Sequence, residues 1–268
     1  ALVEWHIEAG TTGLFVVCST GEMFALSQDE MVEIVEAAVI SADGRIPIIA
    51  GLPFPDVNRK AEIAKRYETV GVDGGVALQP FESPADNDTM YEHYARLADE
   101  VKIPLFIYEH PKWQSTHLLT PTLVGRLVAN GQYVGMKDCT GDLSRLVAMA
   151  DVSKGEFGVM QAVQERLLPS LVCGATGVCA TASNAYPHLY RRLYDTFQAG
   201  DTQKAYELQT TMRILLNMYK ASSGPKHILN RLGLPISTAA RHTREITEEQ
   251  DQATNMLVAF VKEELSGK

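Results

Sequence analysis

The chain has 268 residues, of which 46% are hydrophobic and 21% charged, and 24 Lys and Arg against 33 Asp and Glu give a formal net charge of −9. The length allows one large domain or two small ones, and the composition is typical of globular proteins. An acidic chain without a basic run is a poor candidate for binding nucleic acid or an anionic membrane, and no apolar run reaches the roughly 18 residues of a membrane helix.

Seven short apolar runs recur along the chain, each followed by a segment with helical spacing. The runs are rich in Val, Ile and Phe and do not alternate with polar residues. This pattern predicts strands of a parallel sheet that is covered on both faces. The predicted strands span 13–18, 46–51, 73–79, 103–108, 133–137, 156–160 and 175–179.

Local signals mark the ends of several helices. A capping box, Ser27 with Glu30, precedes an apolar stripe. Thr120 followed by Pro121 places a capping hydroxyl before a proline at the first helical position. Gly200 ends the helix predicted over 186–199.

Seven strand–helix units in under 200 residues indicate a (β/α)8 TIM barrel of the α/β class or a doubly wound sheet. No G-x-G-x-x-G fingerprint is present, which favours the barrel. We therefore predict a barrel over 1–200. Helical spacing and a second capping box at Thr247 predict a C-terminal helical extension over 201–268, packed on the barrel and including a short helix at 225–232.

Seven strands are predicted where a closed barrel has eight, and the missing strand is expected at the N-terminus. The chain opens on a predicted helix over 1–9. A closed barrel needs a strand before Ala1, so we expect the given sequence to lack the first strand. The alternative is a seven-stranded or open barrel with exposed edges.

In a barrel of this type, the active site lies at the C-terminal ends of the strands. One predicted strand ends in Lys137, which is unusual in an apolar run. Burial at the rim lowers the pKa of an amine, and a neutral amine attacks a ketone to form a Schiff base. The competing interpretation is a structural lysine paired with Asp138 or Asp142.

Two other strand ends carry hydroxyl groups. Tyr108 ends the fourth predicted strand and could relay a proton on the same rim, although a tyrosine at this position is more often a packing residue. Ser19, Thr20 and Gly21 follow the first predicted strand and offer hydroxyls and backbone N–H groups to a carboxylate, or form a plain turn.

No metal site is expected. The seven histidines have no ligand spacing, and the four cysteines fit no common zinc pattern and are expected to be reduced thiols. His110 is the histidine to watch, because it lies two residues after Tyr108 at the predicted rim.

These residues together resemble the dihydrodipicolinate synthase / N-acetylneuraminate lyase family of Schiff-base aldolases. The resemblance covers nearly the whole chain. The segment 18–22 (CSTGE) stands where the family shows G-T-T-G-E, and 108–111 (YEHP) where it shows Y-N-x-P. The segment 135–142 (GMKDCTGD) matches G-[IL]-K-[DE]-x-[TS]-G-D.

The resemblance implies a role for each matching residue. Lys137 would be the Schiff-base lysine and Tyr108 the proton-relay tyrosine. Ser19 and Thr20 would bind the keto-acid carboxylate and join the relay, and Cys179 would contact the pyruvyl part through its backbone. The family resemblance also implies a homotetramer or homodimer and a first strand before the opening helix.

The departures concern the substrate. Synthases carry an arginine shortly after Y-N-x-P, whereas this chain has Lys112 and Trp113 there, and a lysine lacks the bidentate fork of arginine. Around Phe81 and Glu82 no hydroxyl replaces the family's relay aromatic. Both changes argue against dihydrodipicolinate synthesis, and we assign His110, Lys112 and Trp113 to substrate binding.

The sequence thus predicts a cytoplasmic lyase, an aldolase or dehydratase, that acts on pyruvate or a 2-keto-3-deoxy acid through an imine at Lys137 and needs no other cofactor. Its partner is a small keto acid, with no nucleic acid and no membrane. Two alternatives stay open at this point. One is dihydrodipicolinate synthase itself, and the other is a barrel that binds a keto acid without turnover.

Overall fold

A computed structural model describes residues 1–80, 86–111, 118–152, 155–241 and 245–267. Its internal contacts divide the chain into two units. One unit is continuous and spans 12–179, and the other combines 1–11 with 180–268. The predicted boundary between barrel and extension at residue 200 remains a prediction.

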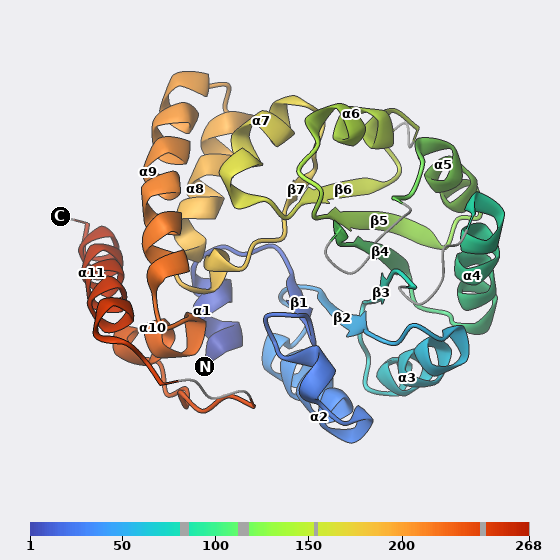
Figure 1. Cartoon of the computed structure of the whole chain (residues 1–268), viewed down its shortest axis with the longest axis horizontal. Helices are drawn as coiled ribbons and strands as arrows, with labels where there is room; N and C mark the ends of the chain where they lie inside the picture. Colours follow the sequence, from blue (N-terminus) through green and yellow to red (C-terminus); the bar gives the residue numbers. More distant parts are fainter. Residues whose placement is uncertain (81–85, 112–117, 153–154, 242–244, 268) are drawn as a thin grey trace. The chain divides into compact units, whose positions relative to one another are not determined.

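The unit 12–179 is built on one sheet of seven parallel strands in chain order (Figure 1). All seven predicted strands are present, which confirms the α/β class with a parallel sheet. That a strand precedes Ala1 remains a prediction. The strands are β1 (Leu14–Val16), β2 (Ile48–Leu52), β3 (Gly74–Leu78), β4 (Leu105–Glu109), β5 (Tyr133–Asp138), β6 (Gly158–Gln161) and β7 (Gly177–Val178).

Helices follow the strands and lie along the outer side of the sheet in Figure 1. The α2 capping box between Ser27 and Glu30 is formed as predicted, and the Thr120 side chain caps α5 ahead of Pro121. The elements of this unit are α2 (Gln28–Ala42), α3 (Val57–Thr69), α4 (Asn87–Glu100), α5 (Pro121–Ala129), α6 (Leu143–Val152) and α7 (Leu167–Val172), with 3-10 turns η1 (Met23–Ala25) and η3 (Gln164–Arg166).

Burial explains why the strands read as continuous apolar runs. Every residue of β3 is buried, and in β2 and β4 four of five residues are buried. A parallel strand that is packed against side chains on both faces has no solvent side, so it shows no polar alternation. The polar residues at the strand ends are therefore exceptions that need a reason.

The unit 1–11 with 180–268 is helical apart from its connections. The Trp5 indole donates to the Asn184 carbonyl at 3.0 Å, which ties the N-terminal helix to this unit. The predicted helix end at Gly200 is confirmed, with φ of 83°, and so is the Thr247 capping box. Its elements are α1 (Leu2–Glu8), η4 (Ala182–Asn184), α8 (Pro187–Gln198), α9 (Thr202–Ala221), α10 (Pro225–Leu232) and α11 (Glu248–Leu265), and α9 packs against α8 and α11.

Candidate active site

Strand register brings the two predicted catalytic residues together. Tyr108 on β4 is the direct register partner of Lys137 on β5. Both side chains are buried, with 2% and 8% of their surface exposed. The Lys137 Nζ lies 4.5 Å from the centre of the Tyr108 ring. An amine and a phenol that are far apart in the sequence thus share one corner of the sheet end.

The Tyr108 hydroxyl is connected to the loop after β1. It lies 3.2 Å from the Ser19 hydroxyl, in a hydrogen bond in which either oxygen can donate. The Phe15 ring meets the Tyr108 ring edge to face at 5.8 Å and lies 5.2 Å from the Lys137 Nζ. Burial raises the pKa of Tyr108, whereas the Lys137 charge lowers it, and the balance is a raised value. The phenol therefore carries its proton at neutral pH and is suited to donating it.

The charge state of Lys137 depends on its neighbours. Burial lowers its pKa, as predicted, but electrostatic interactions with Cys179, Tyr108 and Cys139 raise it, and the balance is a raised value. The expected net lowering is therefore wrong, because it left these neighbours out. Burial also raises the pKa of Cys139 to about 12, so this thiol is neutral at pH 7. With its raised pKa, Lys137 carries a proton at neutral pH and must release it before the amine can attack a carbonyl.

Three of the four cysteines interact with Lys137. The sequence predicted a site role for Cys179 but not for Cys18 or Cys139. Cys179, which was assigned to the keto acid, hydrogen-bonds Lys137 through its side chain. Cys18 and Cys139 also act on Lys137 electrostatically. All of them are free thiols of intermediate exposure. Cys18 directly precedes Ser19 and Cys139 lies two residues after Lys137, so their places in the sequence could have assigned both to the site.

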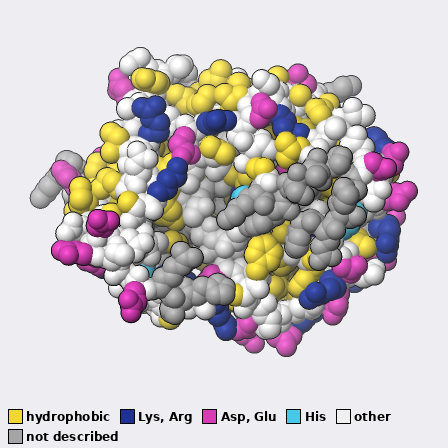
Figure 2. Space-filling model, viewed as in Figure 1, with side chains coloured by type: hydrophobic (Ala, Val, Ile, Leu, Met, Phe, Trp, Pro, Cys, Tyr) yellow, Lys and Arg dark blue, Asp and Glu magenta, His cyan; other side chains and the backbone are white. Residues whose placement is uncertain are grey.

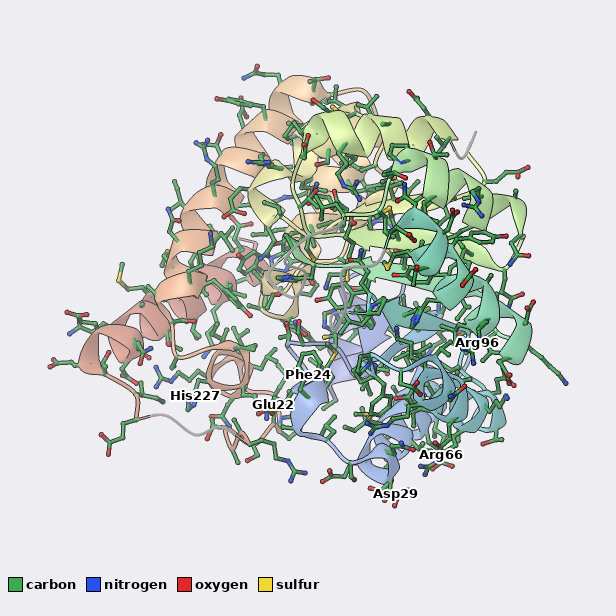
Figure 3. All side chains as sticks on the ribbon, turned by 45° about the vertical axis from the view of Figure 1, so that its right-hand side comes forward. Glu22, Phe24, Asp29, Arg66, Arg96 and His227 are labelled. Atoms are coloured by element: carbon green, nitrogen blue, oxygen red, sulfur yellow. The ribbon has the colours of Figure 1, made fainter. Side chains whose placement is uncertain are left out.

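The loop after β1 has an unusual backbone. Val17 and Glu22 have positive φ angles of 51° and 60°, which β-branched and bulky residues rarely adopt. The Val17 carbonyl passes so close to Gly51 that a Cβ there would lie 2.0 Å from the oxygen. These two bends flank Ser19, Thr20 and Gly21. Glu22 and Phe24, which are labelled in Figure 3, are the N-cap and the middle residue of the 3-10 turn η1 that follows. The loop that carries the predicted carboxylate-binding residues is thus held in a strained form.

A buried ion pair lies behind the Tyr108–Lys137 corner, and the sequence analysis did not find it. Glu109, fully buried, accepts the Leu119 N–H at 2.7 Å and pairs with the Arg145 guanidinium of α6. Arg145 also donates to the Leu119 carbonyl. Asp138 on β5 is the register partner of Glu109. One of its carboxylate oxygens is buried and has no hydrogen-bond partner among the described residues.

The remaining predicted site residues have different outcomes. The His110 ring lies 6.2 Å from the Tyr108 ring, centre to centre, so it shares the rim as expected. Lys112, Trp113, Phe81 and Glu82 lie outside the described residues. The departures that bear on substrate choice therefore stay predictions.

Two general features bear on ligands. In the described ranges, no group of three or more His, Cys, Asp and Glu side chains is arranged to hold a metal ion. None of the described helices combines the length and apolarity needed to cross a membrane. Figure 2 shows acidic and basic side chains interspersed over one face, so an anionic ligand must be held by local groups.

Comparison with protein families adds an independent observation. The sequence model of the dihydrodipicolinate synthetase family matches residues 1–263. A protein from Brucella abortus named 4-hydroxy-tetrahydrodipicolinate synthase is 35% identical over 240 residues, which are 87% of this chain and 80% of that protein. A protein of the same name from Acidiphilium cryptum is 30% identical over 252 residues, 90% of this chain and 86% of that one.

Solved structures are similar over nearly the whole chain. The dihydrodipicolinate synthase from Acinetobacter baumannii, complexed with pyruvate, is 28% identical with a TM-score of 0.88 and covers 97% of this chain and 90% of its own. A prophage protein of the dihydrodipicolinic acid synthase family from E. coli K12, also with pyruvate, is 25% identical at the same TM-score and the same coverage.

Proposed function

The chain belongs to the dihydrodipicolinate synthetase family, and we propose that it forms an imine between Lys137 and pyruvate or a related 2-keto acid. Members of this family are lyases that act on pyruvate through a Schiff base. The observation that carries the proposal is the corner formed by Lys137, Tyr108 and Ser19, with 4.5 Å between amine and ring and 3.2 Å between hydroxyls.

The geometry supports a definite course for the reaction. Lys137 first releases its ammonium proton to solvent, and its neutral Nζ then attacks the C2 carbonyl of the keto acid. The nitrogen gives up one proton and the carbonyl oxygen takes one up, which gives a neutral carbinolamine. Loss of water, with one further proton delivered to the departing oxygen, leaves the protonated imine. Tyr108 is the donor that we assign to these transfers, and Ser19 links it to the loop that receives the carboxylate. Ser19, Thr20, Gly21 and Cys179 are the groups that we assign to the keto acid.

The imine then acts as an electron sink for chemistry at C3. It withdraws electrons from the neighbouring bond, so a C3 proton or a C3–C4 bond is released more easily. No metal or organic cofactor takes part in this scheme. Aldol cleavage, condensation and dehydration all pass through the same intermediate, and the choice between them lies with groups that bind the rest of the substrate.

Synthesis of 4-hydroxy-tetrahydrodipicolinate is the second candidate. It is favoured by the name of the relatives at 30–35% identity, and the lack of an arginine at 112–114 argues against it. Turnover of pyruvate with aspartate semialdehyde, compared with cleavage of a 2-keto-3-deoxy sugar acid, separates the two. We expect the sugar acid to be cleaved faster, and faster turnover of the semialdehyde would reverse this choice.

Exchange of the pyruvate methyl protons in D2O, followed by NMR, tests the imine without a second substrate. The wild-type protein should catalyse the exchange, because the enamine formed from the imine takes up deuterium at C3. Lys137→Ala should lose it while keeping its circular dichroism spectrum. Lys102→Ala, which changes a lysine three residues before β4, is the control and should exchange normally. Exchange that persists in Lys137→Ala would refute the proposal.

A further inference from the structure

The Glu109–Arg145 ion pair is costly and needs an explanation. Removing two charges from water costs several kcal/mol per ion, and their attraction offsets this only with good geometry. The related family pattern has a neutral asparagine where this chain has Glu109. A buried ion pair is weak support for stability by itself, so the pair calls for another role.

The pair closes a ring of three groups, which we call the Glu109–Arg145 clamp. The Glu109 carboxylate accepts the Leu119 N–H and the Arg145 guanidinium, and Arg145 donates to the Leu119 carbonyl. It thereby joins the last residue of β4, a residue ten positions later and helix α6. Every member of the ring is bonded to the other two, so none moves independently.

The clamp acts on the strand end that carries the relay tyrosine. Tyr108 immediately precedes Glu109, and successive side chains of a strand point to opposite faces. The Glu109 side chain meets Arg145 of α6, while the Tyr108 side chain meets Ser19 and lies beside Lys137. Fixing Glu109 on one face thus fixes the backbone from which the Tyr108 ring projects on the other.

We propose that Glu109 and Arg145 are positioning residues for the proton relay, which the clamp holds in register with Lys137 only while Glu109 is ionised. This inference rests on the proposed function of Lys137 and Tyr108. It assigns to neither Glu109 nor Arg145 any contact with substrate.

The surroundings of Glu109 move its ionisation to a higher pH than that of an exposed glutamate. Arg145 faces it from α6, Asp138 and Cys139 from β5 and the turn after it, and Tyr94 from α4. Burial raises the pKa of Glu109, Arg145 lowers it and Asp138 raises it, with a raised value as the balance. Protonation therefore begins at a higher pH than for an exposed glutamate, and it removes the ion pair.

Methyl-proton exchange at saturating pyruvate measures this role, because Lys137 is then already in the imine and its own titration no longer limits the rate. Glu109→Gln keeps an acceptor for Leu119 but loses the charge. We expect its maximal exchange rate to fall about tenfold, with KM for pyruvate within about twofold. The fall of the wild-type rate on the acid side, as Glu109 is protonated, should be absent in this variant.

Asp29→Asn is the matched control, because it breaks another carboxylate–arginine pair. Asp29 and Arg66 are joined at 2.6 Å at the surface, and both are labelled in Figure 3. This variant should keep both the rate and the acid-side fall.

A double variant separates positioning by a charge pair from a general loss of packing. Arg145→Met leaves the Glu109 carboxylate buried beside Asp138 without its cation, so it should lose more activity than Glu109→Gln. Adding Glu109→Gln to Arg145→Met should recover part of that loss. An equal or lower rate in the double variant, or an unchanged pH profile in Glu109→Gln, would overturn the inference while leaving the imine intact. A wild-type protein without exchange would instead refute the proposed function, and the inference with it.

Discussion

The hydrogen bond between Tyr108 and Ser19 is the link on which the proposed relay depends. The two oxygens are 3.2 Å apart, and the raised pKa keeps the phenol protonated at neutral pH. The Phe15 and His110 rings pack against the Tyr108 ring, so removal of the hydroxyl alone leaves its setting in place. Single-atom changes at this link are therefore informative.

Tyr108→Phe removes the proposed proton donor and keeps the ring. We expect the pyruvate exchange rate to fall by about 10²–10⁴, the usual contribution of a positioned acid or base. Ser19→Ala removes only a hydrogen bond, commonly about 0.5–1.5 kcal/mol, and should cost no more than about tenfold. A larger loss of exchange rate in Ser19→Ala than in Tyr108→Phe would show that Tyr108 is not the proton donor.

The sequence identified some residues of this site and not others, for a physical reason. Lys137 and Tyr108 stand out because they are polar ends of apolar strands, and Ser19 because it follows the end of another apolar strand. Glu109 and Arg145 are 36 positions apart and carry no local pattern, so only the packing of α6 against β4 pairs them. A prediction from single residues also missed the thiols that raise the pKa of Lys137.

At the scale of elements, the strained loop after β1 depends on a glycine in the neighbouring strand. A Cβ on Gly51 would lie 2.0 Å from the Val17 carbonyl oxygen, which belongs to the backbone and cannot swing aside. Val17 itself has a φ of 51°, and such a backbone persists only when its surroundings hold it.

Gly51→Ala should therefore be strongly destabilising. We expect a loss of about 2–4 kcal/mol, seen as a fall in Tm of roughly 5–15 °C by calorimetry. Gly125→Ala in α5 is the control, because its nearest neighbour would be an ordinary 3.7 Å away and alanine favours a helix by about 0.5–1 kcal/mol. Equal Tm changes in the two variants would show that the contact at Gly51 is easily relieved.

A buried lysine–histidine contact joins α3 and α4. Lys60 is completely buried, and its Nζ is 2.8 Å from the His93 Nε2. Burial lowers the pKa of Lys60 to about 7, although Asp56 raises it, and burial together with the Lys60 charge lowers the pKa of His93 to about 3. The folded protein therefore holds a lysine that loses its proton near neutral pH.

This lysine should make the stability depend on pH. Between about pH 7 and 10.4, the unfolded chain binds a proton at Lys60 that the folded chain does not, so the free energy of unfolding rises with pH by up to about 1.4 kcal/mol per unit. Below pH 7 both states are protonated and this contribution is flat. Denaturant titrations of Lys60→Met should show a smaller slope in that window. Lys65→Met, an exposed neighbour, should keep the wild-type slope, and equal slopes in all three proteins would contradict the assignment.

Elements were predicted more completely than sites, because their signals are local. Capping boxes at Ser27 and Thr247 and the apolar runs of the seven strands depend on neighbouring residues only, and all of them are present. The 3-10 turns had no such signal. The positive φ of Val17 had none either, since it is imposed by the approach of its carbonyl to Gly51.

At the scale of the whole molecule, the net charge of −9 sets a condition on the substrate. The overall field repels an anionic keto acid, so attraction must come from groups at the strand ends. Lys137 and the N–H groups of the loop 19–21 are the groups that we assign to this task. Added salt weakens the overall repulsion, because exposed charges are screened beyond about 10 Å at 0.1 M.

Covalent trapping of the imine is the most direct test of the central claim, that Lys137 forms a Schiff base with a keto acid. The protein is incubated with pyruvate, reduced with borohydride, weighed intact and then digested for peptide mapping. We predict a mass gain of one reduced pyruvate adduct, located on Lys137 and absent in Lys137→Ala. No stable mass gain, or an adduct that maps to a different lysine, would contradict the account.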